Sequence, residues 1–316
     1  MIPFFIKLKQ YFLEQPLPHA SFYISSRYIS GIQISETGRE IKQHFICPLE
    51  DNVIQPSFHN ENIRNREILE KKISRELEKF HLLDKKIAVL LPELSQKVHA
   101  FSFKELPRSK MEKEKIILFR IRKQQPLLPE DIRVSFDELS LNSTKRVVAG
   151  IVRSAVVQDY EDFFNSLGLK VRVVGIPSLC LCNLLDKNKN LMLVNINDDS
   201  FSLVAAMQGE IILYRQKPIA LTARPQEMLE QKMENIIQEI ENTIHFMEDK
   251  EKKQFDSLWI RPGFLESNEE IYSRLGARLE LPVQTIDASI GLKLSQKEKR
   301  ILSPLIGQLI WRNKTD

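Results

Sequence analysis

The stretch that decides the fold runs from residue 191 to residue 215 and reads LMLVNINDDSFSLVAAMQGEIILYR. Its first six residues form a nearly continuous apolar run, which is typical of a buried strand. Two further apolar segments follow, residues 201–207 and 211–215, and the turn residues Gln208 and Gly209 separate them. This pattern predicts a β-hairpin. The stretch as a whole predicts an antiparallel meander.

A meander of the same kind is predicted near the N-terminus. Residues 22–34 alternate between apolar and polar side chains, and residues 40–46 do so again after the turn signal Glu36-Thr37-Gly38. After each meander, strand and helix patterns alternate. This order is better explained by a duplicated α/β unit than by one continuous sheet, with a boundary near residue 185.

Local signals place the remaining elements. Ser109 and Glu112 form a capping-box pattern at the start of a helix, Gly168 is suited to the end of another, and Pro177 is suited to a first helical turn. Pro304 is expected to interrupt the last helix. Helices are expected near residues 69–80, 109–124, 154–167, 177–185, 225–247, 269–279 and 296–311, and strands near 86–91, 98–103, 133–139, 146–153, 169–175, 257–260 and 283.

Glycine is scarce, with ten residues in a chain of 316. Its nearest pairs, such as Gly31 and Gly38, are seven positions apart. A P-loop needs glycines five positions apart, and a dinucleotide fingerprint needs them two and three apart, because their backbone amides must approach phosphate. Both nucleotide-binding motifs are therefore excluded.

Charge and cysteine content indicate a globular protein of a reducing compartment. The chain has 46 basic and 42 acidic residues, a net charge of +4, which gives little support to nucleic-acid binding. Its three cysteines form no C-x-x-C pair. No apolar run has the length of a membrane span, so we expect a cytoplasmic protein.

Residues 1–13 mix apolar side chains with lysines, and a helix docked on its own domain is favoured there over a segment that binds the membrane surface.

No catalytic or metal site is predicted from motifs. The six histidines lack metal-ligand spacing, and there is no G-x-S-x-G elbow. Asp198 and Asp199 could hold a metal ion, but their place between two strands favours a role in a turn. In residues 109–123 acidic residues interleave with basic ones, which favours a solvated helix face.

Several phrases, in this order, resemble the PilM-type actin-like proteins of type IV pilus assembly, which are related to the cytoplasmic part of the GspL protein of type II secretion. The resemblance covers most of the chain. Its phrases are IAVLLP at 87–92, LP at 106–107, QPLLPED at 125–131, FD at 136–137, VVAGIVR at 147–153, NSLGLKV at 165–171 and GIPSL at 175–179.

The resemblance implies an α/β, actin-like ATPase fold made of two ribonuclease-H-like lobes. The first lobe would span residues 1–185 and the second residues 186–316. A subdomain would be inserted in the first lobe at about residues 87–140.

Family members bind ATP between the lobes through two Asp-x-Gly hairpins, whose glycines admit phosphate while the aspartates organise Mg²⁺. At the first hairpin the resemblance places Tyr23 for Asp and Ser25 for Gly. At the second it places Asn195 for Asp and Asn197 for Gly. The adenosine-side Ser-Gly-Gly corresponds to residues 261–263, of which only Gly263 matches a glycine.

We therefore predict a pseudo-ATPase with a degenerate nucleotide cleft, no catalytic residue and no cofactor. Residual binding of ATP and Mg²⁺ stays open, because Asn can adopt a left-handed backbone and can ligate hydrated Mg²⁺ weakly. Asp198 or Asp199 could also supply a carboxylate.

The resemblance also implies a partner. In this family the body captures the cytoplasmic tail of a PilN-like inner-membrane protein in a groove between the first lobe and its inserted subdomain. Membrane association would then be indirect, through that partner and other pilus or secretion proteins. The corresponding residues here are Ile87, Val89, Leu91, Ile117 and Phe136.

Two alternatives remain at this stage. One is an active actin-like ATPase or sugar-kinase relative, whose acidic residues would converge on Mg²⁺. The other is a split or divergent GspL-like secretion component.

Overall fold

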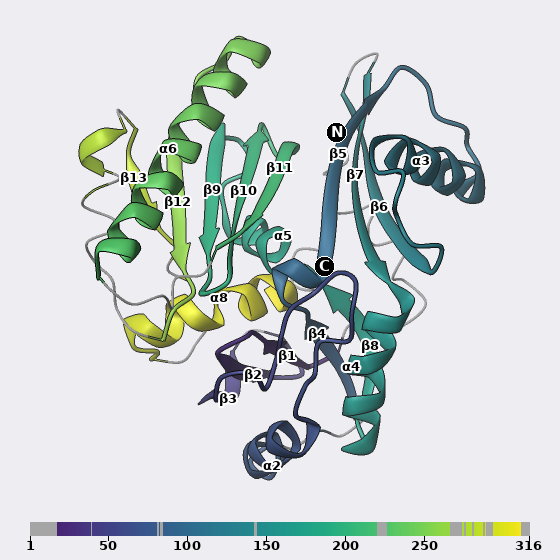
Figure 1. Cartoon of the computed structure of the whole chain (residues 1–316), viewed down its shortest axis with the longest axis vertical. Coiled ribbons are helices and arrows are strands. Elements are labelled where there is room, and N and C mark those ends of the chain that lie inside the picture. Colours follow the sequence, from purple (N-terminus) through teal and green to yellow (C-terminus); the bar gives the residue numbers. More distant parts are fainter. Residues whose placement is uncertain are drawn as a thin grey trace.

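Two five-stranded sheets form the framework of the computed structural model (Figure 1). The strand order is β3-β2-β1-β4-β8 in the first sheet and β11-β10-β9-β12-β13 in the second. In each sheet three sequential antiparallel strands are followed by two parallel strands, so the predicted duplication is confirmed. The structure describes residues 18–38, 40–80, 82, 85–141, 144–219, 226–265, 274, 276–279, 281–286, 288 and 293–310.

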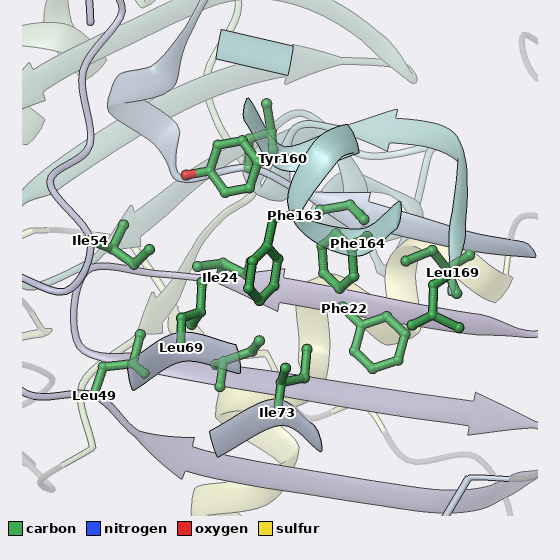
Figure 2. Packing of buried hydrophobic residues seen from close by; sticks show 14 of the residues in the cluster. Phe22, Ile24, Leu49, Ile54, Leu69, Ile73, Tyr160, Phe163, Phe164 and Leu169 are labelled. Atoms are coloured by element: carbon green, nitrogen blue, oxygen red, sulfur yellow. The ribbon is translucent and has the colours of Figure 1, made fainter. Parts of the chain in front are cut away.

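The first sheet is covered on one face by α2 (Arg66–Leu77) and α4 (Ser154–Ser166). Its strands are β1 (Ala20–Ile24), β2 (Tyr28–Ile34), β3 (Ile41–Pro48), β4 (Lys86–Leu90) and β8 (Lys170–Gly175). Phe22 and Ile24 of β1 pack with Leu69 of α2 and Phe164 of α4 (Figure 2). Tyr23, between them in sequence, points to the opposite face, as the two-residue period of a strand requires.

The opposite face of the first sheet is covered by α8 (Gln296–Ile310), the last described helix. This corrects the assignment of all of residues 186–316 to the second lobe. The correction follows from packing, because Ile301 and Leu305 of α8 share a core with Tyr23 and Ile32. Figure 1 shows α8 crossing the middle of the molecule, where it meets both lobes.

The helix α8 also runs through Pro304 without a break, so the predicted interruption is wrong. A proline inside a helix removes one N–H and leaves the carbonyl four residues earlier without its helical partner. That carbonyl belongs to Arg300, and it accepts a hydrogen bond from the hydroxyl of Ser303 at 2.8 Å.

The second lobe has the same plan as the first. Its elements are β9 (Leu191–Ile196), β10 (Ser200–Met207), β11 (Glu210–Pro218), α6 (Gln226–Glu251), β12 (Ser257–Pro262) and β13 (Val283–Thr285). Val194 and Ile196 of β9 pack with Ile236 and Ile240 of α6. The apolar stripe of this helix therefore belongs to the core, as its spacing predicts. Most of the helix predicted at 269–279 lies outside the described residues.

A separate three-stranded sheet, ordered β5-β7-β6, forms the inserted subdomain with α3 (Lys110–Gln124). Its strands are β5 (Gln96–Phe103), β6 (Ile132–Leu141) and β7 (Thr144–Arg153). The predicted limits of 87–140 are therefore too early at both ends. The strand β4 pairs with β1 and β8 of the first sheet, whereas β7 is the central strand of the inserted one.

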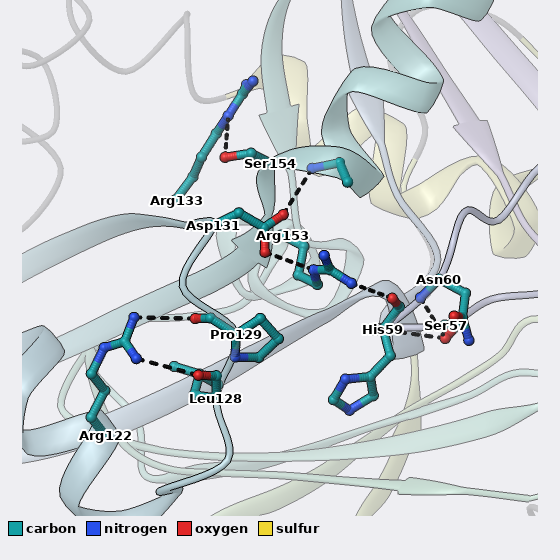
Figure 3. A network of polar contacts seen from close by, with 11 residues as sticks. Ser57, His59, Asn60, Arg122, Leu128, Pro129, Asp131, Arg133, Arg153 and Ser154 are labelled. Carbon is teal, nitrogen blue, oxygen red and sulfur yellow. Dashed lines mark hydrogen bonds and ion pairs between the residues drawn. The ribbon is translucent and has the colours of Figure 1, made fainter.

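A polar network joins the inserted subdomain to the first lobe (Figure 3). The Asp131 carboxylate accepts from Nε of Arg153 at 2.8 Å and from the backbone N–H of Ala155, at the start of α4, at 3.3 Å. Arg153 in turn donates to the carbonyl of His59. The first turn of α4 is thus capped by a residue more than twenty positions away, which is why no local capping pattern precedes Ser154.

Other local signals have mixed outcomes. Gly168 ends α4 with a φ of 72°, and Pro177 begins α5 (Pro177–Leu181), as predicted. Ser109 precedes α3 but makes no side-chain cap hydrogen bond, so the predicted capping box is wrong. α5 is followed by the short 3-10 turn Cys182–Leu184 and is shorter than expected. No helix in the described part of the chain combines the length and apolar character that crossing a membrane requires.

Candidate functional site: an arginine-filled cleft and a neighbouring pocket

The residues that the resemblance assigns to nucleotide binding meet where the two sheets face each other. Tyr23 lies in β1, Asn195 in β9, Asn197 directly after β9, and Gly263 directly after β12. The structure places one further side chain at their centre, Arg261 of β12, which is fully buried. No feature of the alternating sequence around residue 261 marks it for this role.

The guanidinium of Arg261 is bound by side chains of both lobes. Its Nη1 donates to Oδ1 of Asn197 at 2.9 Å and to Oδ1 of Asn195 at 3.1 Å. Its Nη2 donates to the hydroxyl of Tyr28 at 2.9 Å. The second lobe thereby supplies two amide oxygens and the first lobe a phenolic oxygen.

The C-terminal helix supplies the remaining acceptors. Nε of Arg261 donates to the carbonyl of Arg300 at 3.0 Å, and Nη2 donates to the carbonyl of Ile301, also at 3.0 Å. The Arg300 carbonyl is the one that Pro304 leaves without a helical partner. A guanidinium has five N–H donors. Each of the five therefore has an acceptor inside the protein.

The close packing of Arg261 and Asn197 against residue 263 leaves room only for a glycine. A Cβ at this position would lie 2.5 Å from Oδ1 of Asn197 and would also collide with Nη1 of Arg261. Such contacts are far below van der Waals distance. The glycine that matches the family pattern thus makes room for a guanidinium of the chain itself.

Two tyrosines line the first-lobe side of the same space. The Tyr23 and Tyr28 rings meet edge to face with centroids 5.8 Å apart, and Cζ of Arg261 lies 6.0 Å from the Tyr23 centroid. Burial is the main cause that raises the pKa of both phenols. Both hydroxyls therefore stay neutral at physiological pH. At the position of the family's metal-organising aspartate there is an uncharged aromatic side chain.

Ser25, at the place of the first hairpin glycine, holds the turn between β1 and β2. Its Oγ accepts from the backbone N–H of Tyr28 at 3.0 Å and of Arg27 at 3.2 Å. These backbone amides are therefore already hydrogen-bonded within the turn.

Asp198 and Asp199 occupy the turn between β9 and β10, closed by a hydrogen bond from the Asn197 N–H to the Ser200 carbonyl at 2.7 Å. Asp199 Oδ1 accepts from the Ser200 hydroxyl at 2.8 Å. Burial and then the neighbouring Asp199 raise the pKa of Asp198 to about 6, although Arg27 acts in the opposite direction. Among the described residues no three acidic, histidine or cysteine side chains converge in the manner of a metal site.

A second buried side chain, Glu93, lies on the other side of Asn195 from Arg261. Glu93 Oε1 accepts from Nδ2 of Asn195 at 3.0 Å and from the backbone N–H of Ser178 at 2.8 Å. Its Oε2 accepts from the hydroxyl of Tyr214 at 2.6 Å. Asn195 therefore bridges the carboxyl group of Glu93 and the guanidinium of Arg261. Sequence reasoning missed Glu93, because a single acid after a strand carries no distinctive pattern.

These side chains do not fit a magnesium nucleotide. Mg²⁺ is held in proteins by carboxylates together with phosphate oxygens. A cation, Arg261, lies at the centre of this cleft instead, and its five N–H groups are already bound. The arginine thus repels a metal ion and has no donor left for a phosphate.

The predicted partner groove needs correction. Ile87, Val89, Leu91 and Ile117 have no exposed surface, so their side chains cannot contact a partner in this structure. The physical reason for the first three is that Ile87 and Val89 of β4, and Leu91 directly after it, point into the core that α2 and α4 cover. Phe136 belongs to the wall of a pocket, but its side chain packs on the cluster beneath α3.

The pocket itself lies between the inserted subdomain and the rest of the molecule, with a volume of about 250 Å³. Its wall is formed by strands β6 and β7 of the inserted sheet, by β8 and by the segment after β8, and the predicted groove did not include that last segment. It includes Asp137 of β6, Val148 of β7, Val174 of β8, and Ile176 and Leu179 around α5. Val148, Val174, Ile176 and Leu179 make much of the wall apolar.

Comparison with known proteins identifies the fold. The chain is similar to a chain of the PilM-PilN type IV pilus biogenesis complex, with a TM-score of 0.76 and 11% identity over 94% of this chain and 99% of the other. It is also similar to a Bacteroides thetaiotaomicron protein described as having an actin-like ATPase fold and unknown function, with a TM-score of 0.55 and 12% identity over 98% and 99% of the chains. The cytoplasmic domain of EpsL of the Vibrio cholerae type II secretion system is less similar, with a TM-score of 0.46 and 12% identity over 94% of each chain.

No family model matches the sequence, and no curated protein does. At 11% identity the structural similarity establishes the fold. The protein has an actin-like fold of two lobes with an inserted subdomain, and the resemblance to PilM is confirmed at that level.

Proposed function

We propose that this chain is a scaffold protein of a type IV pilus or related secretion machine, acting at the cytoplasmic face of the inner membrane. It binds the cytoplasmic tail of a PilN-like membrane protein and neither binds nor hydrolyses ATP. The similarity to a chain of the PilM-PilN complex over nearly the full length of both chains supports the assignment to pilus or secretion machinery.

The single observation that carries the scaffold role is that every N–H group of the Arg261 guanidinium already donates a hydrogen bond within the protein. A protein that cycles through ATP binding needs a cleft that can open to admit the nucleotide. In this chain the cleft is occupied by a guanidinium that joins Tyr28 of one lobe to Asn195 and Asn197 of the other. The resulting body is held together without a ligand, which suits a protein whose task is to bind other proteins.

The pocket beside the inserted subdomain supports tail binding. Its volume of about 250 Å³ accommodates one or two apolar side chains of an extended peptide. Asp137, Asp186, Lys187 and Lys189 also belong to its lining and can contribute polar contacts. We place the tail here, against β6, β8 and α5, in place of the buried strand β4.

A titration with a fluorescent peptide of the partner's cytoplasmic tail tests this proposal. The probe is a peptide with the sequence of the cytoplasmic tail of a PilN-like membrane protein, and the readout is fluorescence anisotropy. Leu179→Ser should weaken binding at least about tenfold, because it removes an apolar pocket contact. Leu118→Ser is a matched control on α3, at the opposite face of the inserted sheet, and should leave the affinity unchanged. Absence of binding to the unaltered protein at high micromolar peptide would refute the proposed partner.

A further inference from the structure

The outer face of α3 carries an unusual row of exposed side chains. Met111, Lys115, Phe119 and Lys123 follow one another at intervals of four residues, so they line one side of the helix. Met111 is 64% and Phe119 70% exposed. The row alternates between apolar and basic residues, and one exposed acid, Glu112, lies beside it.

The inner face of the same helix packs against the hydrophobic core of the inserted subdomain. Ile117 and Ile121 are fully buried against the inserted sheet. The exposed apolar residues are therefore additional to those that the fold needs. Figure 1 shows α3 at the outer edge of the molecule, on the side of the inserted sheet away from the second lobe.

Neighbouring residues extend the row at both sides. Ile116, 40% exposed, lies next to Phe119, and Leu127, 95% exposed, lies just beyond the end of the helix. We call Met111, Ile116, Phe119, Leu127 and the cations Arg108, Lys115 and Lys123 the α3 outer face. In the described part of the chain, none of these three cations makes a side-chain hydrogen bond or an ion pair.

We propose that the α3 outer face docks directly on a membrane surface rich in anionic lipid. Apolar side chains flanked by lysines are suited to such a surface, because the rings and thioethers enter the headgroup region while the ammonium groups remain at the phosphates. Charge complementarity selects this occupant: three unpaired cations outnumber the one exposed acid on this side of the helix, Glu112, so the α3 outer face has a net positive charge that matches an anionic leaflet.

This docking is independent of the proposed tail pocket. The pocket opens on the face of the inserted sheet that carries Val148, whereas α3 covers the face that carries Val147 and Ala149. A failure of tail binding would therefore not contradict membrane docking, and a failure of membrane docking would not contradict tail binding.

Co-sedimentation of the full chain with vesicles tests the inference. Vesicles of phosphatidylcholine containing about 30% phosphatidylglycerol should bind the protein, and binding should fall with added salt. Pure phosphatidylcholine should bind it weakly. Lys115→Gln with Lys123→Gln should reduce binding about 25-fold, since each cation near an anionic surface contributes a factor of about five. Lys71→Gln with Lys253→Gln removes the same charge at exposed sites elsewhere and should have little effect.

The apolar contribution is tested separately. Phe119→Ser with Met111→Ser should also reduce binding several-fold, whereas Phe246→Ser, on the exposed side of α6, should not. Circular dichroism melting of each variant shows whether it is folded. Vesicle binding that is absent, or that persists in both α3 variants, overturns the inference, and persistence would place the contact elsewhere, such as residues 1–13. Concentration-dependent self-association abolished by Phe119→Ser would show that a second copy covers this face, which also overturns it.

Discussion

The guanidinium of Arg261 donates from Nη1 to Oδ1 of Asn197 at 2.9 Å, which ties the end of β12 to the turn after β9. Both residues lie at positions that the family resemblance assigns to nucleotide binding. In this chain they bind each other. Both side chains are buried, so this contact is part of the protein interior.

Arg261→Met tests how much this interaction contributes to stability. The variant leaves the Asn195, Asn197 and Tyr28 groups unpaired in the interior and leaves Glu93 without a nearby cation. We expect the free energy of unfolding to fall by about 3 kcal/mol or more, measured by urea titration. Arg261→Lys should recover little of this, because an ammonium cannot reproduce the planar fork.

Arg278→Met is the matched control. Arg278 forms ion pairs with Glu234 and Glu241 on the exposed surface of α6. Surface pairs contribute little, so this variant should unfold close to the unaltered protein. Equal losses of unfolding free energy in the two variants would show that the buried network stabilises the fold no more than a surface ion pair does.

Gly263→Ala tests the close packing around the arginine. The added Cβ would lie 2.5 Å from Oδ1 of Asn197, so either the guanidinium or the amide must move. We expect a loss of about 2 kcal/mol in urea unfolding. Gly276→Ala, where a Cβ meets nothing within 4 Å, should be neutral or slightly stabilising. A harmless Gly263→Ala would mean that Arg261 is held loosely.

Asp198 predicts a specific pH dependence. Its folded pKa, about 6, lies above that of an unfolded aspartate, so the folded state binds the proton more tightly. Its contribution to stability is therefore greatest below about pH 4 and is lost as the pH rises to about 6. Asp198→Asn should be more stable than the unaltered protein at pH 7, by about 3 kcal/mol, and show little difference at pH 4.

Urea titrations at several pH values between 4 and 7 measure this difference. Asp131→Asn provides a control of opposite sign, because the hydrogen bond from Arg153 lowers the pKa of Asp131. That variant should be less stable than the unaltered protein at pH 7. A pH-independent difference for Asp198→Asn would show that this carboxyl has an ordinary pKa.

The framework of the fold could be predicted from sequence because it rests on local patterns. Alternation in residues 22–34 predicts the first meander, the turn residues Gln208 and Gly209 between two apolar segments predict the hairpin of the second, and both meanders are present. The boundaries that failed depend on tertiary pairing. The strands Lys86–Leu90 and Thr144–Arg153 belong to different sheets, and no local pattern distinguishes them.

For the site, the sequence predicted which positions come together but not the hydrogen bonds between them. The resemblance located Tyr23, Asn195, Asn197 and Gly263, and the structure brings them together. Arg261 lies within the assigned stretch 261–263, but its hydrogen-bond partners are residues 28, 195, 197, 300 and 301, which are separated by up to 273 positions. Such a network depends on the arrangement of three elements in space, and so does the acceptor that Pro304 leaves at Arg300.

Isothermal titration of the unaltered chain with ATP in the presence of Mg²⁺ tests the central claim most directly. If Arg261 fills the cleft, no saturable heat should appear up to about 1 mM nucleotide, which corresponds to a binding free energy weaker than about 4 kcal/mol. Saturable, Mg²⁺-dependent binding with micromolar affinity would contradict the account, because a nucleotide could then displace the guanidinium and the cleft would be functional.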